Sequence, residues 1–176
     1  GEAGGAVLRR RALDDLVDRT LAMMNAGATL DQIVHEVRVP DDTLALPYLR
    51  PLYDEPEFVV RNVWRRYGGW WDANPARLKP PTDRALAAEV AGLSGGPAML
   101  ARRAAEVADG GDLRLACQLA EWAVQADPDS AVAHRVRARV YEQRKRTESS
   151  LMAKGIFSGA ASESADRATQ LEDGAV

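Results

Sequence analysis

The sequence predicts an all-α protein. Apolar residues recur at three- and four-residue steps along most of the chain, whereas the sustained alternation of apolar and polar residues that marks strands is nearly absent. Glycine and proline separate the periodic segments from one another. We therefore expect a helical bundle of about six to eight helices, with a tetratricopeptide-like antiparallel helical hairpin in its second half.

Two helices are expected before the first proline. The first carries its apolar residues on one stripe and ends at Gly27, a residue type that favours the left-handed turn after a helix. Thr29 and Gln32 have the spacing of a capping box and begin a second, short helix. The stripe of the first helix is Leu13, Leu16, Val17, Leu21 and Met24, and the buried face of the second is Leu30, Ile33, Val34 and Val37.

Prolines divide the segment that follows. Pro40, Pro47, Pro51 and Pro56 leave room only for single turns between them, so residues 40–56 are predicted to be irregular or extended. Pro56 suits a first helical turn, whose amides lack partners within the helix. The helix that it begins is expected to end near Tyr67, before two glycines and a turn-rich aromatic stretch.

The second half is predicted to be helical throughout. Thr82 caps a segment that reaches Leu93, and further helices are expected over about residues 97–109, 112–126 and 129–146. A 34-residue tetratricopeptide pattern that starts at Pro97 places small residues where two helices of a hairpin cross. The residues that fit this pattern are Ala104, Ala116, Ala123, Pro128, Ala138 and Tyr141. About one and a half units match, which predicts a hairpin more strongly than a peptide-binding groove, because independent solenoids need about three.

Composition argues against several classes of partner. The 176 residues carry 23 basic and 26 acidic side chains, for a net charge of −3, so nucleic acid is a poor candidate. The run Arg9-Arg10-Arg11 is interpreted as a solvated helix face, since Asp14 and Asp15 follow it closely. The absence of a membrane-spanning apolar run and of a signal-peptide pattern, with Cys117 as the single cysteine, predicts a cytoplasmic protein without membrane contact.

No self-contained catalytic site is indicated by the sequence. His35 and His134 stand far apart, and neither belongs to the closely spaced pairs that bring zinc ligands together. Glycine-rich phosphate loops are also absent. We therefore expect a chain that catalyses nothing by itself and that holds no metal or other cofactor.

Aromatic and arginine residues concentrate between Tyr48 and Lys79. Two interpretations compete. The aromatic side chains fill the gap between helical layers, or Tyr67, Trp70 and an arginine project into a pocket where the guanidinium binds a sulfate or a carboxylate. The packing interpretation is favoured, because aromatic clusters usually lie in cores or interfaces.

Stretches of this same segment resemble the dimerisation domain of bacterial alkyl sulfatases, class III sulfatases of the metallo-β-lactamase superfamily. They read YLRP at residues 48–51, YDEPEFVVRN at residues 53–62 and YGGWWDANP at residues 67–75, of which the last is the most specific. The likeness covers about residues 10–158. Ala73 stands where the family usually has glycine, and a left-handed turn at this position would be strained.

The resemblance implies an all-helical domain that follows a zinc-dependent catalytic domain, joins two subunits and helps to cover the catalytic cleft. The implied partners are a second copy, in a homodimer, and the metallo-β-lactamase-like domain of the same enzyme. The implied zinc belongs to an H-x-H-x-D-H motif that this sequence lacks. The candidates for the substrate cleft are Tyr67, Arg61, Asn62 and Trp70, and those for the dimer interface or packing are Tyr53, Phe58, Trp64 and Trp71.

These observations predict three parts of the chain. Residues 1–5 are expected to be a flexible N-terminus, residues 6–158 the helical dimerisation domain, and residues 159–176 a disordered tail rich in glycine, alanine and serine. The expected function is that of a non-catalytic assembly module of a zinc-dependent alkyl sulfatase. The alternatives are a tetratricopeptide-like adaptor that binds a peptide, and a self-standing anion binder that uses the arginines.

Overall fold

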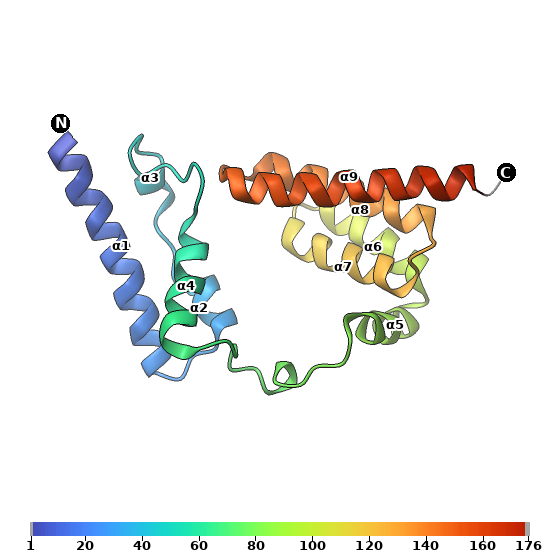
Figure 1. Ribbon diagram of the computed structural model, residues 1–176, viewed down its shortest axis with the longest axis horizontal. Helices are drawn as coiled ribbons and strands as arrows, with labels where there is room; N and C mark the ends of the chain where they lie inside the picture. Colours follow the sequence, from blue (N-terminus) through green and yellow to red (C-terminus); the bar gives the residue numbers. More distant parts are fainter. Residues whose placement is uncertain (1, 175–176) are drawn as a thin grey trace. The chain divides into compact units, whose positions relative to one another are not determined.

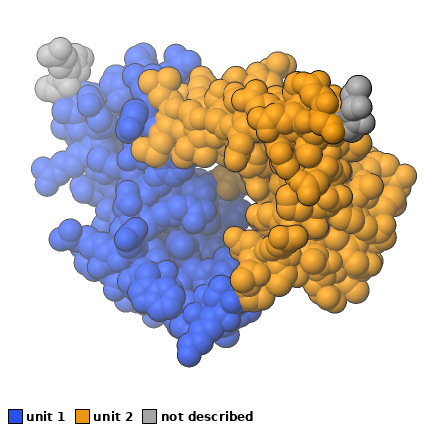
Figure 2. All heavy atoms as spheres, turned by 45° about the vertical axis from the view of Figure 1, so that its right-hand side comes forward, with its two compact units in different colours: residues 1–80 blue, residues 81–176 orange. Residues whose placement is uncertain are grey.

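A computed structural model describes residues 2–174 of the chain, and the side chains of residues 4–174. Every regular element in that range is a helix, which confirms the predicted all-α class. The chain forms two compact units, residues 1–80 and residues 81–176 (Figures 1 and 2). No helix among the described residues is both long and apolar enough to cross a membrane.

Unit 1 consists of the long helix α1 and shorter elements around a core of large side chains. Its elements are α1 (Glu2–Asn25), α2 (Leu30–Glu36), α3 (Asp41–Leu44), α4 (Pro56–Gly68) and the 3-10 turn η1 (Pro75–Arg77). The predicted capping box is present, since Thr29 and Gln32 each accept a hydrogen bond from the other's backbone amide. Helix α4 packs against both α1 and α2. The core residues are Leu16, Ile33, Val34, Val37, Val39, Val60 and Trp64.

Unit 2 consists of helices that pack closely. Its elements are α5 (Asp83–Ser94), α6 (Pro97–Asp109), α7 (Leu113–Ala126), α8 (Ala131–Thr147) and α9 (Leu151–Asp173). The first four agree with the predicted spans to within a few residues. Side chains of Thr82, Asp112, Ser130 and Ser150 each accept a hydrogen bond from a first-turn amide, at the start of α5, α7, α8 and α9.

Alanines form most of the core of unit 2. Ala104, Ala116 and Ala123, which the repeat pattern places at helix crossings, are fully buried, whereas Ala138 is only half-buried. Helices α6 and α7 pack against each other and are joined by residues 110–112, which makes them a helical hairpin. Its assignment to the tetratricopeptide type stays a prediction.

The structure corrects the expected state of both ends of the chain. Residues 2–5 are helical rather than flexible, and Gly5 is buried so tightly that an added Cβ would lie 3.2 Å from Tyr48 Cγ. Residues 159–173 are part of α9 rather than of a disordered tail. Helix α9 runs along α8 (Figure 1), and the small side chains Ala161, Ser164 and Ala168 are buried. Residues 1, 175 and 176 lie outside the described residues.

A polar network joins α7, α8 and α9. The Nε of Arg137 donates to Glu121 Oε1 at 2.8 Å, and its Nη1 donates to the Ala160 carbonyl at 3.0 Å and to Ser164 Oγ at 2.7 Å. The hydroxyl of Tyr141 donates to the same Glu121 oxygen at 2.7 Å. Burial, together with this hydrogen bond, raises the pKa of Tyr141 above its usual value, so the hydroxyl remains a donor.

Candidate interaction site

The aromatic residues of unit 1 lie on α4 and on the loop of residues 69–79, which we call the aromatic loop. Trp64 faces the core with only 7% of its surface exposed. Its indole Nε1 donates to the Trp71 carbonyl at 3.0 Å, and the indole of Trp71 donates to the Asn74 carbonyl at 2.9 Å. The indole of Trp64 therefore ties the aromatic loop to α4, and the indole of Trp71 closes a hydrogen bond within the loop.

Asp72 organises the turn inside the aromatic loop. Its Oδ1 accepts from the Asn74 amide at 3.0 Å, and its Oδ2 pairs with Arg77 Nη1 at 2.7 Å. Its carbonyl accepts from the Leu30 amide at 3.2 Å, which connects the loop to the start of α2. The Asn74 amide, and then the Arg77 guanidinium, hold the pKa of Asp72 below its usual value, because both stabilise the carboxylate.

Ala73 adopts the left-handed conformation, with φ of 66°. It is the one non-glycine residue with positive φ among the described residues. A left-handed conformation costs an alanine about 1–2 kcal/mol, because its Cβ crowds the carbonyl oxygen. The hydrogen bonds of Asp72 and Asn74 on either side hold the turn in this shape.

Tyr67 and Trp70 point away from the core. They are 60% and 75% exposed, and the Arg66 guanidinium carbon lies 5.8 Å from the centre of the Tyr67 ring. The chain turns directly between them, since Gly69 has φ of 85°. The next residue back, Gly68, lies so close to Met24 that a Cβ would stand 2.9 Å from its terminal methyl. Two large aromatic side chains are thus presented to solvent at the end of α4.

The other predicted site residues are divided between surface and interior. Arg61 already has an acidic partner, because its Nη2 lies 2.8 Å from Glu57 Oε1, one helical turn away. Asn62 is exposed, and so is Tyr53 at 64%, whereas Phe58 is half-buried. Trp64 and Trp71 pack inside unit 1 as described above. The roles of all these residues in a cleft or an interface stay predictions.

The residue types that bind zinc do not come together in the described part of the chain. His35 belongs to unit 1 and His134 to unit 2. No group of three or more histidine, cysteine, aspartate or glutamate side chains arranged to hold a metal ion occurs among residues 4–174. Burial raises the pKa of Cys117 to about 11, so its thiol is protonated at neutral pH. These residues do not fit a zinc centre.

Comparison with known proteins decides the family. The sequence model for alkyl sulfatase dimerisation matches residues 29–167. This chain belongs to the alkyl sulfatase dimerisation family. The match contains the aromatic loop and helices α2 to α8 entire, and it runs past the predicted boundary at residue 158 into α9.

Relatives and solved structures of this family are much longer proteins. A linear primary-alkylsulfatase of Pseudomonas sp. (strain ATCC 19151) is 29% identical over 77% of this chain and 26% of its own length. An (R)-specific secondary-alkylsulfatase of Pseudomonas sp. is 38% identical over 73% of this chain and 20% of its own length. The structure of a double mutant of the sec-alkyl sulfatase PisA1 superimposes with a TM-score of 0.80 at 30% identity, over 88% of this chain and 25% of that protein. The chain therefore spans a fifth to a quarter of the proteins that it matches.

Sequence reasoning missed the pairing of Asp72 with Arg77 that fixes the aromatic loop. A signal for the turn was present, because Asp72 and Asn74 are residues whose side chains accept from amides two residues ahead, and Pro75 follows them. It also missed the pocket that Arg9 and Arg50 line in unit 1. The partner of Arg77 and the shape of that pocket both depend on packing that the local sequence does not encode.

Proposed function

We propose that this chain is a non-catalytic assembly module of a zinc-dependent alkyl sulfatase. In this proposal it joins two subunits into a homodimer and helps to cover the active-site cleft of the neighbouring catalytic domain. Membership of the dimerisation family supports the assembly role. The relatives are sulfatases by name and this chain matches 20–26% of their length, so we assign the metal-activated hydrolysis of the ester to the remainder of such an enzyme.

The exposure of Tyr67 and Trp70 is the observation that carries this proposal. Burial of a large apolar side chain contributes about 1.5–3 kcal/mol, and this stabilisation is largely forgone when the side chain stays in water. Aromatic residues are enriched at protein interfaces, where they supply much of the binding energy. We therefore infer that this pair lies where the second subunit borders the cleft.

The order of the aromatic loop supports the same proposal. Residues between Trp64 and Arg77 are connected by hydrogen bonds of 2.7–3.0 Å within unit 1. An interface that is ordered before binding loses less conformational entropy when its partner arrives. In our proposal the Trp71 and Asp72 side chains position the loop, and Trp70 makes the contact.

Sedimentation velocity on the full 176-residue chain tests the proposal. We expect a dimer that dissociates on dilution, and a Tyr67→Ser/Trp70→Ser variant that dimerises at least tenfold more weakly. Leu93→Ser, which removes a side chain 83% exposed on α5, is the control and should change nothing. Circular dichroism should show the same helicity in all three proteins.

Each result has a separate meaning. A chain that stays monomeric at all concentrations would contradict the assembly role and favour the tetratricopeptide-like adaptor. A double variant that dimerises as tightly as the original chain would contradict the role of Tyr67 and Trp70. Steady release of sulfate when zinc and decyl sulfate are added to the chain would contradict its non-catalytic nature.

A further inference from the structure

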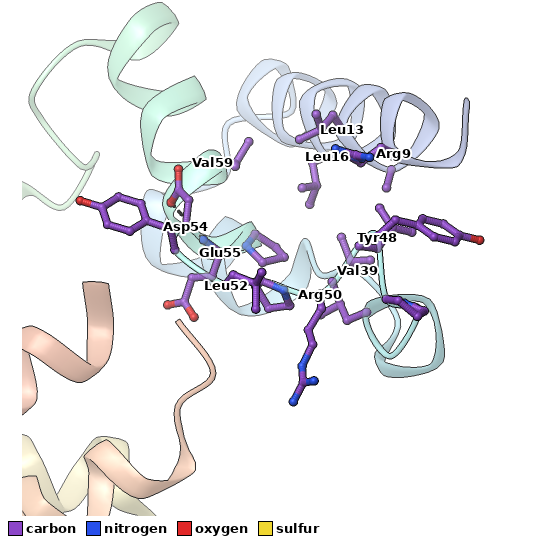
Figure 3. A pocket seen from close by; sticks show the side chains of 17 residues that line it. Arg9, Leu13, Leu16, Val39, Tyr48, Arg50, Leu52, Asp54, Glu55 and Val59 are labelled. Carbon is purple, nitrogen blue, oxygen red and sulfur yellow. Dashed lines mark hydrogen bonds between the residues drawn. The ribbon is translucent and has the colours of Figure 1, made fainter. Parts of the chain in front are cut away.

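Unit 1 contains a pocket between α1 and residues 47–56 (Figure 3), which we call the α1 pocket. Its volume is about 550 Å³, which lies within the range of about 300–1,000 Å³ that is typical of small-molecule sites. The walls are mostly aliphatic. The apolar side chains that line it are Leu13, Leu16, Val39, Leu44, Leu49, Leu52 and Val59.

Prolines keep this pocket open. Pro47 and Pro51 prevent the chain after α3 from forming a helix that would pack down on α1, so residues 47–56 pass over it as turns. The floor belongs to the core of unit 1, because Leu16 and Val39 are buried. The mouth carries exposed aliphatic residues, of which Leu52 is 63% exposed. The pocket therefore has an apolar floor and an exposed aliphatic side chain at its mouth.

Two arginine side chains at this pocket have no partner among the residues that the structure describes. Arg9 and Arg50 line it, and the guanidinium of neither makes a hydrogen bond or an ion pair with a described residue. Other arginines of α1 do have partners, since Arg10 pairs with Asp14 and Arg19 with Asp15. An unpaired guanidinium beside an apolar cavity is able to bind a carboxylate or a sulfate through two parallel hydrogen bonds.

The acidic residues of the pocket lie away from Arg9. Asp54 and Glu55 line the opposite side in Figure 3, where Arg9 and Tyr48 stand at the other end and Arg50 extends outward below. The Oδ1 of Asp54 accepts from the Glu55 amide at 3.0 Å, which engages it with the backbone of its own turn. The rim is thus positively charged on the side of Arg9 and negatively charged on the side of Asp54.

We propose that the α1 pocket binds a straight-chain aliphatic anion, an alkyl sulfate or an alkyl carboxylate. The tail occupies the space between Leu13, Leu52 and Val59, and the head group binds Arg9 at the rim. Each methylene that leaves water should tighten binding about fourfold, and the charged head should fix the orientation of the tail. This binding needs neither a dimer nor catalysis, so it stands apart from the proposed function.

Calorimetric titration of the full chain with ligands below their micellar concentration tests head and tail separately. Decyl sulfate and decanoate should bind saturably, with one molecule per chain. Decylammonium, which has the same tail and the opposite charge, should bind at least tenfold more weakly. Inorganic sulfate, which has the head without a tail, should give no measurable heat.

Variants of the pocket identify its residues. Arg9→Gln/Arg50→Gln should weaken decyl sulfate binding at least tenfold, whereas Arg11→Gln, which removes the same charge from α1 outside the pocket, should leave it unchanged. Ala12→Phe should fill the pocket and abolish binding, with Ala22→Phe on the exposed surface of α1 as its matched control. If Ala12→Phe fails to fold, Leu52→Asp places a repelling charge at the exposed mouth and should weaken binding in the same way.

Three outcomes overturn the proposal. They are equal binding of decylammonium and decyl sulfate, unchanged binding in the Arg9→Gln/Arg50→Gln variant, and unchanged binding in Leu52→Asp. If Leu52→Asp instead dissociates a dimer and leaves decyl sulfate binding intact, the pocket is a protein interface and the proposal is wrong. A monomeric chain that binds decyl sulfate would overturn the proposed function alone.

Discussion

The cores of unit 1 and unit 2 are built from side chains of different size. Unit 1 places branched aliphatic residues and Trp64 between its helices, whereas unit 2 places mainly alanines between its own. An alanine side chain buries little apolar surface, so unit 2 gains from the close approach of long helices and from the network around Arg137. The stability of unit 1 therefore depends on a few large side chains, whereas that of unit 2 depends on many small contacts and on the polar network around Arg137.

This difference predicts where each unit is vulnerable. Truncation of one large side chain should leave a cavity in unit 1 that the surrounding structure fills only in part. In unit 2, loss of any single alanine contact should lower the free energy of unfolding only slightly. Loss of Arg137, which joins three helices, should lower it more than loss of any one alanine. Substitutions with matched controls of the same residue type separate these two kinds of dependence.

Trp64→Ala is expected to have the largest effect. It removes a buried indole from the core of unit 1 together with its hydrogen bond to the Trp71 carbonyl. Truncations of this kind lower the free energy of unfolding by about 3–5 kcal/mol. Urea unfolding followed by circular dichroism measures this loss. Trp70→Ala, at a position 75% exposed, should stay within about 0.5 kcal/mol of the original chain, and equal losses in the two variants would contradict the placement of Trp64.

Arg137→Met tests the polar network of unit 2 and is expected to have an intermediate effect. The methionine keeps much of the apolar stem of the side chain. It leaves Tyr141 as the remaining partner of Glu121 in the network, and it removes the hydrogen bonds from Arg137 to Ser164 and to the Ala160 carbonyl of α9. Hydrogen bonds to charged groups are worth about 1.5–3 kcal/mol, so we expect a loss of about 2 kcal/mol in the same urea experiment.

Arg139→Met is the matched control on α8. Its ion pair with Asp109 joins two side chains that are each about half exposed or more, and such pairs contribute about 0–1 kcal/mol. Hydrogen exchange adds a local readout, since Arg137→Met should raise exchange at the α9 amides and Arg139→Met should not. If the α9 amides of Arg137→Met exchange as slowly as those of the original chain, the packing of α9 against α8 does not need the polar network.

Helix ends in both units were predictable from short sequence signals, but the docking of α9 was not. Thr29, Thr82 and Gly27 act on amides and carbonyls within a few residues, so capping patterns locate these ends correctly. The composition of residues 159–173 resembles that of a disordered tail. Their helix is held by Arg137, more than twenty residues earlier in the chain, and a local reading cannot detect such a contact.

The aromatic residues show the same limit within the candidate site. Val60, Val63 and Trp64 follow the three- and four-residue spacing of one face of α4, so the burial of Trp64 agrees with its helical phase. Trp70 follows Gly69, where the backbone turns, so the helical spacing no longer determines the side on which its side chain lies. The sequence therefore indicates that the segment matters for packing or binding, while only the structure separates Trp64 and Trp71 from Tyr67 and Trp70.

Asp72→Asn is expected to have the smallest effect, and it shows whether the aromatic loop of unit 1 depends on charge. Asparagine keeps an oxygen that accepts from the Asn74 amide but loses the ion pair with Arg77, whose side chain is 62% exposed. We expect a loss of about 1 kcal/mol or less at neutral pH. Because the folded state lowers the pKa of Asp72, this stabilisation is fully present above about pH 4 and declines as the pH falls below that.

The measurement is thermal unfolding of both proteins across this pH range. The difference in Tm between the original chain and Asp72→Asn should be constant from neutral pH down to about pH 5 and should shrink below about pH 4. Glu142→Gln on α8 provides the comparison in unit 2, since Lys145 holds the pKa of Glu142 below its usual value on an open helix surface. If the Tm difference for Asp72→Asn does not change with pH, hydrogen bonds to neutral groups alone hold the aromatic loop.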